Sequence, residues 1–111
     1  MFADIAGFAS WSSRRNPVDV LQLLELLFKE FDILDLQTGV FKVSTIGDCS
    51  LETSGLPDIR DDHAEVMAKF SVKFHKIFEV VTTLNNRFKD SVWFTLWACN
   101  CWCPLGDTIK V

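Results

Sequence analysis

Two aspartates, Asp4 and Asp48, have the residue type and spacing best suited to chemistry in this chain of 111 residues. Asp4 lies in the β-type apolar run of residues 2–8, and Asp48 follows the β-type run of residues 40–46. One helix-length segment separates the two runs, so both carboxylates can meet at one edge of a sheet. Paired carboxylate oxygens are the ligands that Mg²⁺ or Mn²⁺ bound to a triphosphate requires. The spacing therefore predicts a site for a divalent cation that also binds phosphate oxygens.

The segment between the two aspartates carries the signals of a helix. Asn16 can serve as the N-cap, Pro17 fits the first helical position, and Asp19 falls in the first turn. Gly39 is a plausible C-cap. Apolar residues at helical spacing predict a buried face: Val20, Leu24, Leu27, Phe28, Phe31 and Leu34.

The remaining segments predict the fold class. Residues 2–8 read as a strand, 9–15 as a polar loop, and 40–46 with 49–53 as a hairpin around Gly47-Asp48. A second helix is predicted over residues 62–88. Its apolar stripe has spacings of four and three: His63, Met67, Phe70, Phe74, Ile77, Val81, Leu84 and Phe88. One further strand after this β-α-β-β-α order completes an α+β, ferredoxin-like (split βαβ) sandwich.

Composition restricts the possible classes of protein. The chain is long enough for one domain, and 49% hydrophobic residues with ten Phe can fill a core. The net charge of −4 and the lack of a basic stripe exclude nucleic acid as a partner. Neither a leader nor a membrane-length apolar run is visible. The alternation of Cys99, Cys101 and Cys103 does not match zinc-ligand spacing, and we expect a reducing compartment.

Four short motifs together give the chain a recognisable resemblance. Residues 2–8 reproduce F-x-D-I-x-G-F, and residues 42–49 reproduce K-x-x-T-I-G-D-C. Residues 54–57 read S-G-L-P, and residues 62–64 read D-H-A. In this order, and on these predicted elements, the motifs resemble the catalytic domain of the class III nucleotidyl cyclases, the adenylate and guanylate cyclases.

The resemblance implies a metal-dependent reaction. In that family the ribose 3′-hydroxyl of a nucleoside triphosphate attacks the α-phosphorus, and a 3′,5′-cyclic nucleotide and pyrophosphate form with help from two metal ions. Carried over to this chain, Asp4 and Asp48 are the expected ligands of two Mg²⁺ or Mn²⁺ ions. The backbone carbonyl of Ile5 is expected to assist them.

The resemblance also implies contacts with the substrate, ATP or GTP. The backbone of Ala6, Gly7 and Phe8 is expected to face the phosphates, and Gly7 permits a close approach. Ser44 occupies the position that reads the purine, which is Glu in guanylate cyclases and Lys in adenylate cyclases. Because Ser is small and uncharged, the sequence leaves the preference for ATP or GTP open.

The chain departs from the family in its last segment. Lys110 stands where the family has Asn, and the Arg that stabilises transition-state charge falls just beyond Val111. The family's fourth strand, R-F-G-L-H-S-G-P-V-T-A-G-V-L, has no visible counterpart in residues 91–104. We therefore divide the domain into family-like residues 1–90, aberrant residues 91–104 and family-like residues 105–111, and we expect an incomplete fold there and impaired activity.

A frameshift accounts for the aberrant segment. Every Trp codon is TGG, so a shift of one nucleotide turns it into a triplet that begins with GG and encodes Gly. Trp93, Trp97 and Trp102 have the spacing of the three glycines in F-G-L-H-S-G-P-V-T-A-G. We hypothesise that residues 91–104 are a frameshifted copy of the family's fourth strand.

Three alternatives remain open. The chain can supply only the metal-binding half of a heterodimer, since the family's site forms between two domains, in a homodimer or a heterodimer. It can be an inert pseudo-cyclase or a fragment of a larger cyclase, which its start at the first strand and its stop before the Arg favour. A diguanylate cyclase-like domain is the third, although no G-G-[DE]-E-F run is present. The resemblance implies a cytoplasmic domain, in a parent protein that is often a membrane receptor.

Overall fold

The computed structural model of the chain describes residues 1–84 and 93–97. The elements follow the order strand, two helices, two strands, helix and strand. They are β1 (Phe2–Ala6), α1 (Phe8–Ser12), α2 (Pro17–Thr38), β2 (Phe41–Ile46), β3 (Cys49–Thr53), α3 (His63–Leu84) and β4 (Trp93–Trp97).

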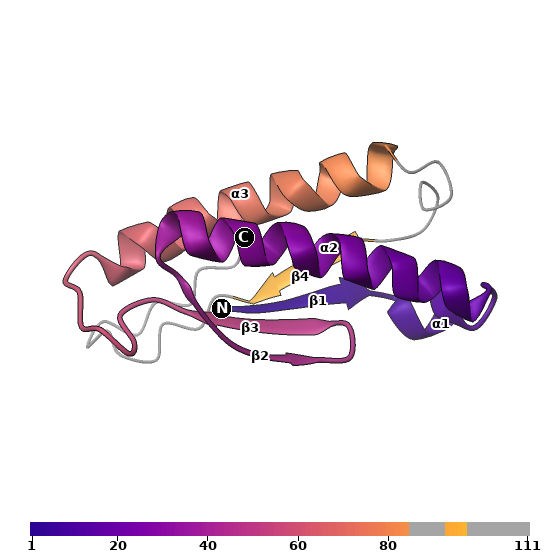
Figure 1. The fold of residues 1–111 in the computed structure, drawn as a ribbon, viewed down its shortest axis with the longest axis horizontal. Helices are drawn as coiled ribbons and strands as arrows, with labels where there is room; N and C mark the ends of the chain where they lie inside the picture. Colours follow the sequence, from indigo (N-terminus) through magenta and orange to yellow (C-terminus); the bar gives the residue numbers. More distant parts are fainter. Residues whose placement is uncertain (85–92, 98–111) are drawn as a thin grey trace.

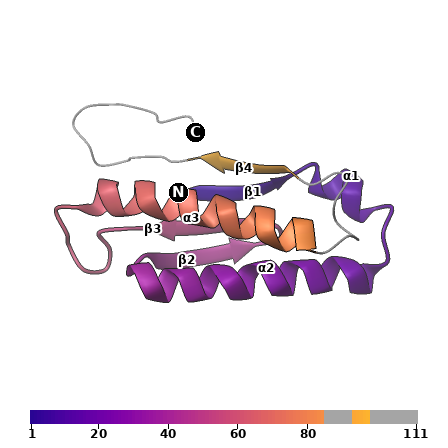
Figure 2. The same cartoon turned by 90° about the horizontal axis from the view of Figure 1, so that it is seen from above.

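The strands form one antiparallel sheet in the order β2-β3-β1-β4. Helices α2 and α3 lie side by side over one face of that sheet, as Figures 1 and 2 show from two directions. The other face has no covering helix within the described residues. The chain crosses from β1 through α2 to the edge strand β2, and from β3 through α3 to the other edge strand β4. These two strand-helix-strand units make the split βαβ arrangement. The predicted α+β, ferredoxin-like sandwich is therefore confirmed.

Helix α2 begins and ends at the residues that its local signals predict. The side chain of Asn16 accepts a hydrogen bond from the backbone N–H of Val18 at 3.0 Å, which satisfies one of the free N–H groups of the first turn. Gly39 ends the helix in the left-handed region, with φ of 71°. Glycine adopts this conformation without a Cβ clash, so it is the usual residue at this position.

The core lies between the two long helices and the covered face of the sheet. The rings of Phe31 on α2 and Phe74 on α3 stack with centroids 3.6 Å apart and planes inclined by 16°. Ala3 and Ile5 of β1 contribute from the sheet. Leu23 and Phe78 are also buried, although the predicted stripes did not include them. The predicted apolar stripes therefore lie on the buried faces of α2 and α3. Each buried face is wider than its stripe, because it also includes neighbouring positions such as Leu23 and Phe78.

Residues 7–12 differ from the prediction, which was wrong here. Strand β1 ends at Ala6, not at Phe8, and α1 replaces the start of the expected loop. Gly7 has a φ of 73° and turns the chain out of the sheet. The helix then buries Trp11, whose ring packs near Phe8 at a centroid distance of 6.0 Å. Burial of these two rings outweighs the weak helix signal of the polar residues around them.

Strand β4 forms within residues 91–104, the segment that the sequence analysis describes as aberrant. Residues of β4 pair in register with β1 from Phe2↔Trp97 to Ala6↔Trp93. The aromatic and β-branched residues there suit a strand, and the edge of β1 offers unpaired backbone groups. Residues 85–92 and 98–111 lie outside the described part of the chain, as do the predicted end of the second helix and the remainder of the aberrant segment.

Within the described residues, neither long helix combines the length and apolar character needed to cross a bilayer.

Candidate active site at the end of β1 and the hairpin turn

The register of the sheet brings Asp4 and Asp48 together. Asp4 lies directly opposite Cys49 in the pairing of β1 with β3. Asp48 precedes Cys49 in the tight turn between β2 and β3, where Gly47 has a φ of 60°. Both aspartates are half-buried. The adjacency that the spacing predicted is therefore a consequence of the antiparallel register.

The environment of Asp48 makes its charge costly. Burial raises the pKa of the Asp48 carboxyl, and the neighbouring Asp4 carboxyl raises it further through a hydrogen bond and through like charge. Hydrogen bonds from the backbone of Asp48 and Ile5 act in the opposite direction. Two carboxylates this close favour either a shared proton or a bound cation.

The donor set at this position suits a divalent cation that also binds phosphate. No Lys or Arg among residues 1–84 forms an ion pair with Asp4 or Asp48. The described residues also include no group of three or more His, Cys, Asp and Glu placed to hold a metal. Mg²⁺ is commonly held by one or two carboxylates, with waters and substrate phosphates as the other ligands. The two aspartates fit that pattern better than they fit a closed structural metal site.

Gly7, which follows Asp4 by three residues, has open space around its Cα. A Cβ built on Gly7 meets no other heavy atom within 4 Å. Gly7 also precedes the first turn of α1, whose Trp11 N–H donates to the Gly7 carbonyl at 2.9 Å. Ala6, Gly7 and Phe8 thus form the turn from β1 into α1, immediately after Asp4 and Ile5. The backbone here is accessible to a ligand that lies beside the two carboxylates.

Ser44 lies on the same face of the sheet as Asp4. Ser44 pairs with Leu51, and Leu51 pairs with Phe2, which stands two residues before Asp4 on β1. Residues that lie directly opposite or two apart along a strand share a face. The register therefore places Ser44 and Asp4 on the uncovered side of the sheet, and the hydrogen bond between the two carboxyls keeps Asp48 beside Asp4.

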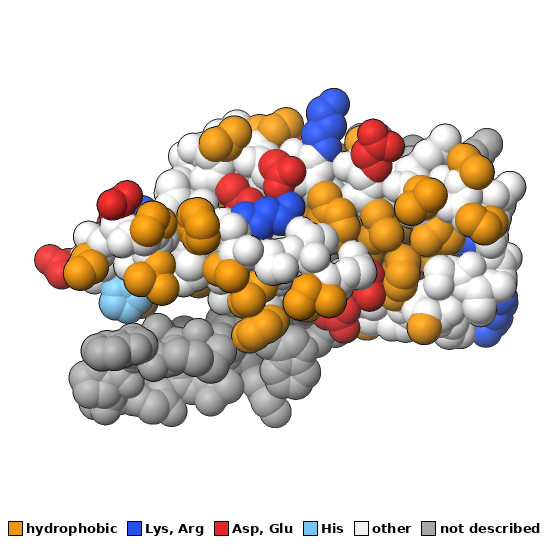
Figure 3. Space-filling view, turned by 60° about the horizontal axis from the view of Figure 1, so that its bottom comes forward, with side chains coloured by type: hydrophobic (Ala, Val, Ile, Leu, Met, Phe, Trp, Pro, Cys, Tyr) orange, Lys and Arg blue, Asp and Glu red, His pale blue; other side chains and the backbone are white. Residues whose placement is uncertain are grey.

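The uncovered face includes several exposed apolar side chains among the described residues. Phe2, Phe41, Val43 and Ile46 are exposed, with Ile46 at 71% of its full accessible area. Figure 3, which turns the sheet side of the molecule forward, shows apolar side chains spread over much of this view. An apolar surface of this kind around a half-buried site is typical of a protein-protein interface.

Cys49 is a residue of the site that sequence reasoning left without a role. Its thiol is free and half-buried. Burial raises the pKa of the thiol, and the charges of Asp4, Asp48 and Glu52 raise it further. The thiol therefore stays neutral beside the two aspartates. Its place directly after Asp48 on a two-residue turn was the signal that could have identified it.

Lys110, the residue in the position of the family's Asn, lies outside the described residues.

Comparison with known proteins gives a consistent result. The family model of the adenylate and guanylate cyclase catalytic domain matches residues 1–93. A receptor-type guanylate cyclase of Caenorhabditis elegans is 46% identical over 77 residues, which cover 68% of this chain and 6% of that protein. An adenylate cyclase of Mycobacterium tuberculosis is 38% identical over 72 residues, which cover 65% of this chain and 16% of that protein. The chain thus spans a small part of these curated relatives.

Solved structures agree with the sequence relatives. The guanylate cyclase domain of RhGC from Catenaria anguillulae, in complex with GTP, has a TM-score of 0.71 at 30% identity. It covers 97% of this chain and 65% of the solved chain. The monomeric guanylyl cyclase domain from Blastocladiella emersonii has a TM-score of 0.75 at 34% identity, and covers 85% and 53% of the two chains. The chain belongs to the family of adenylate and guanylate cyclase catalytic domains.

Proposed function

We propose that this domain takes part in the conversion of a nucleoside triphosphate, ATP or GTP, to a 3′,5′-cyclic nucleotide and pyrophosphate. The single observation that carries the proposal is the juxtaposition of Asp4 and Asp48 on the uncovered face of the sheet. Membership of the cyclase family gives that juxtaposition its chemical meaning.

Asp4 and Asp48 are the residues that would hold two divalent cations, Mg²⁺ or Mn²⁺, with the backbone carbonyl of Ile5 as a further ligand. When bound, these cations neutralise phosphate charge and lower the pKa of a coordinated hydroxyl. The protein's own part is to hold two carboxylates on strands whose register is set by the sheet. A rigid backbone of this kind keeps the ligands at a constant spacing.

The turn of Ala6, Gly7 and Phe8 is proposed to bind the phosphates. Its backbone follows Asp4 directly, and the space beside Gly7 allows a phosphate oxygen to approach the main chain. Ser44 is proposed to face the base, because it shares the uncovered face with Asp4. A short hydroxyl offers one donor and two acceptor positions and therefore discriminates weakly between adenine and guanine.

The uncovered face is proposed to pair with a second cyclase domain, in a homodimer or a heterodimer. Its exposed Phe2, Val43 and Ile46 favour such a contact. A related domain from Blastocladiella emersonii is described as dimeric and another as monomeric. Lys110, which stands in the position of the family's Asn, is the reason to expect weak activity from a homodimer.

The test is a cyclase assay on the purified chain with Mn²⁺, in which ATP and GTP are offered separately. Asp48→Asn removes a metal ligand with little change in volume, and Asp61→Asn, an exposed residue before α3, is the matched control. We expect any cyclic product to disappear in Asp48→Asn and to persist in Asp61→Asn. Equal product from the chain and from Asp48→Asn would refute the assignment of the site.

A second candidate is that the chain supplies the metal-binding half of a heterodimer. This role is favoured because the sequence keeps the family's Asp4 and Asp48 but differs from the family at Ser44 and Lys110. The chain is mixed with an intact cyclase domain whose own two aspartates are replaced by Asn, so neither protein alone has a complete site. Product from the mixture, and none when the chain carries Asp48→Asn, supports this role. No product from a mixture shown to associate argues for an inert domain.

We infer that the domain is cytoplasmic. The free thiol of Cys49 is compatible with a reducing compartment. Relatives include proteins described as a receptor-type guanylate cyclase and a membrane guanylyl cyclase. We therefore also infer that the domain belongs to a membrane-attached protein.

A further inference from the structure

Strand β2 contains a bulge between Lys42 and Ser44. Lys42 pairs with Glu52 and Ser44 pairs with Leu51, so Val43 is an extra residue that has no counterpart on β3. Residues two apart on a regular strand share a face, but these two do not. Glu52 is fully buried, which places Lys42 on the covered face, whereas Ser44 lies on the uncovered face. The exposed Val43 therefore stands next to Ser44 on the uncovered face.

Lys42 is attached to α2 by several attractions. Its ammonium is 2.6 Å from a carboxylate oxygen of Asp32 and 5.3 Å from the ring centroid of Phe28, a distance at which an aromatic ring attracts a cation. Burial raises the pKa of Asp35 and of Glu52, and the charge of Lys42 lowers both. Both carboxylate oxygens of Asp35 and the Oε2 of Glu52 have no hydrogen-bond partner among the described residues. The Lys42 charge thus compensates three carboxyls on the covered side of the sheet.

The hairpin has a competing register without the bulge. With the turn unchanged, Val43 would pair with Glu52 and Lys42 with Thr53, and every side chain before the bulge would change face. Phe41 and Val43 are 47% and 51% exposed. In the competing register both would face the helices, which burial of apolar surface favours, and Lys42 would leave the carboxyls. Apolar burial therefore opposes the bulge, and the charges around Lys42 support it.

We infer that Lys42 is a positioning residue: its attachment to α2 holds the bulge, and the bulge keeps Val43 beside Ser44 on the uncovered face. The meaning of this arrangement for catalysis rests on the proposed function, in which Ser44 faces the base. Val43 then offers the base an apolar surface next to the Ser44 hydroxyl. An apolar contact with the flat face of a purine does not read its edge. Val43 therefore contributes to the affinity for ATP and GTP alike, and the choice between them stays with Ser44.

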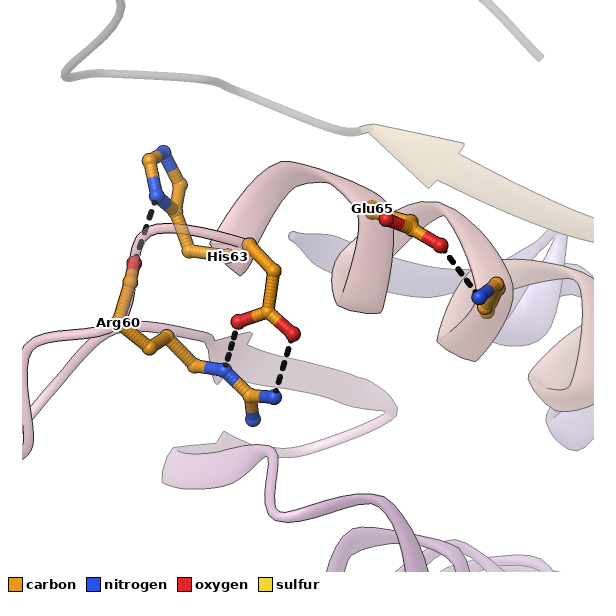
Figure 4. Close-up of polar contacts among 5 residues, drawn as sticks. Arg60, His63 and Glu65 are labelled. Atoms are coloured by element: carbon orange, nitrogen blue, oxygen red, sulfur yellow. Dashed lines mark hydrogen bonds and ion pairs between the residues drawn. The ribbon is translucent and has the colours of Figure 1, made fainter.

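The experiment removes the Lys42 charge and follows the position of Val43. In Lys42→Thr the side chain is too short to reach Asp32, and Thr suits a strand. Lys42→Arg keeps both the charge and the reach. Lys69→Thr is the matched control, because Lys69 also pairs with a carboxylate, that of Glu65, but on the exposed surface of α3, as Figure 4 shows. Circular dichroism shows whether each variant is folded.

Methyl NMR of the ¹³C-labelled chain reports the register. In the unaltered chain, Lys42→Arg and Lys69→Thr, we expect a soluble paramagnetic agent to broaden the Val43 methyl signals, and we expect no NOE from these methyls to the Phe28 ring. In Lys42→Thr the Val43 methyls should lose most of this broadening and give NOEs to Phe28. The reason is that Val43 takes the place of residue 42 over that ring.

Nucleotide binding to the Mn²⁺-loaded variants tests the consequence for the site. Lys42→Thr should weaken the binding of ATP and of GTP by a similar factor, about tenfold, and leave their ratio unchanged. A chain that binds neither nucleotide would contradict the proposed function, while the Val43 signals would still decide whether Lys42 holds the bulge.

Three results would overturn the inference: Val43 methyls that stay exposed in a folded Lys42→Thr, the same change of register in Lys42→Arg or Lys69→Thr, or a changed register with unchanged nucleotide affinity. If Lys42→Thr does not fold, Asp32→Asn replaces it, because the Asp32 side chain is 57% exposed and its loss leaves the core intact. Undiminished broadening at Val43 in Asp32→Asn would then overturn the inference as well.

Discussion

Asp4 and Asp48 lie side by side at one end of the sheet because Asp4 pairs with Cys49, the residue that follows Asp48. A shift of this register by one residue would turn Asp4 to the covered face, where Ala3 and Ile5 now fill the core. The placement of the two proposed metal ligands and the hydrophobic core therefore depend on the same strand pairing. Mutations that loosen the core between β1 and the helices should disturb the site even where they do not touch it.

Replacement of Asp4 by Asn should separate stability from metal binding. The variant removes a like charge beside Asp48, so the metal-free chain should gain about 1 kcal/mol of unfolding free energy. The unaltered chain should gain about 2.7 kcal/mol when Mn²⁺ is present at a hundred times its Kd. We expect Asp4→Asn to lose that gain. Thermal unfolding with and without Mn²⁺ measures both effects, and an undiminished response to Mn²⁺ would show that Asp4 is not a ligand.

Asp35 should make the chain less stable as the pH rises. Its pKa is about 7 in the folded chain and 3.8 in the reference state. At pH values between these two, Asp35 holds more of its proton in the folded state than in the unfolded state. Its contribution to the free energy of unfolding is therefore greatest at low pH and falls as the pH rises toward 7. The slope from this one group is at most about 1.4 kcal/mol per pH unit.

Denaturant unfolding of the chain and of Asp35→Asn at pH 5, 6, 7 and 8 measures that slope. Asn cannot ionise, so the variant should lose this part of the pH dependence and should be the more stable protein at pH 8. Asp61→Asn is the control for a surface carboxylate. Parallel pH profiles for the chain and Asp35→Asn would mean that Asp35 ionises normally.

The stack of Phe31 on Phe74 should be a main support of the helix layer. Both rings are fully buried, with centroids 3.6 Å apart. Phe31→Ala should lower the free energy of unfolding by about 3–5 kcal/mol, since it removes a buried ring and leaves a cavity between α2 and α3. Phe41→Ala, at a position that is 47% exposed, should cost less than about 1 kcal/mol. Equal losses in the two variants would contradict the packing described for α2 and α3.

Ser44 should control the choice of base. If it faces the purine, Ser44→Glu should favour GTP and Ser44→Lys should favour ATP, because a carboxylate accepts from guanine N–H groups and an ammonium donates to adenine nitrogens. Competition between labelled ATP and GTP for the Mn²⁺-loaded chain gives the ratio of affinities. Thr53→Glu, on the neighbouring strand at the far end of the hairpin, is a control for added charge. A ratio unchanged in both Ser44 variants would place the base elsewhere.

The frameshift hypothesis predicts the nucleotide sequence of the segment that encodes residues 91–104. A shift of one nucleotide should restore a strand that resembles F-G-L-H-S-G-P-V-T-A-G, with glycine at the positions of Trp93, Trp97 and Trp102. A chain made in the restored frame should unfold more cooperatively than the present one. The nucleotide sequence of the segment is the direct test. If the shifted frame does not encode these glycines, the frameshift hypothesis is wrong.

The sequence predicted those parts of the fold that depend on neighbouring residues. Asn16, Pro17 and Gly39 define both ends of α2, since capping bonds and a positive φ are local properties. The tight turn at Gly47 was predictable for the same reason. Motif resemblance identified the family, which the comparisons confirmed over residues 1–93.

Burial could not be predicted in the same way. The polar residues around Trp11 favour a loop, yet packing of its ring against the core makes residues 8–12 helical. Asp35 stands four residues after Phe31, on the face of α2 that the apolar spacing predicts to be buried, but only the placement of β2 and β3 beneath α2 shows that Glu52 lies near it. Local sequence contains no information about what lies across the sheet.

The sequence by itself determined the family, the ends of α2 and the choice of Asp4 and Asp48 as the proposed metal ligands. Only the tertiary structure decided that Asp4 and Asp48 meet on the uncovered face, that Ser44 shares that face, and that Asp35 is buried at the opposite end of the hairpin. The physical reason is that capping and turn signals act over a few residues. Strand register and the enclosure of a charge are instead set by pairing and packing between segments distant in the chain.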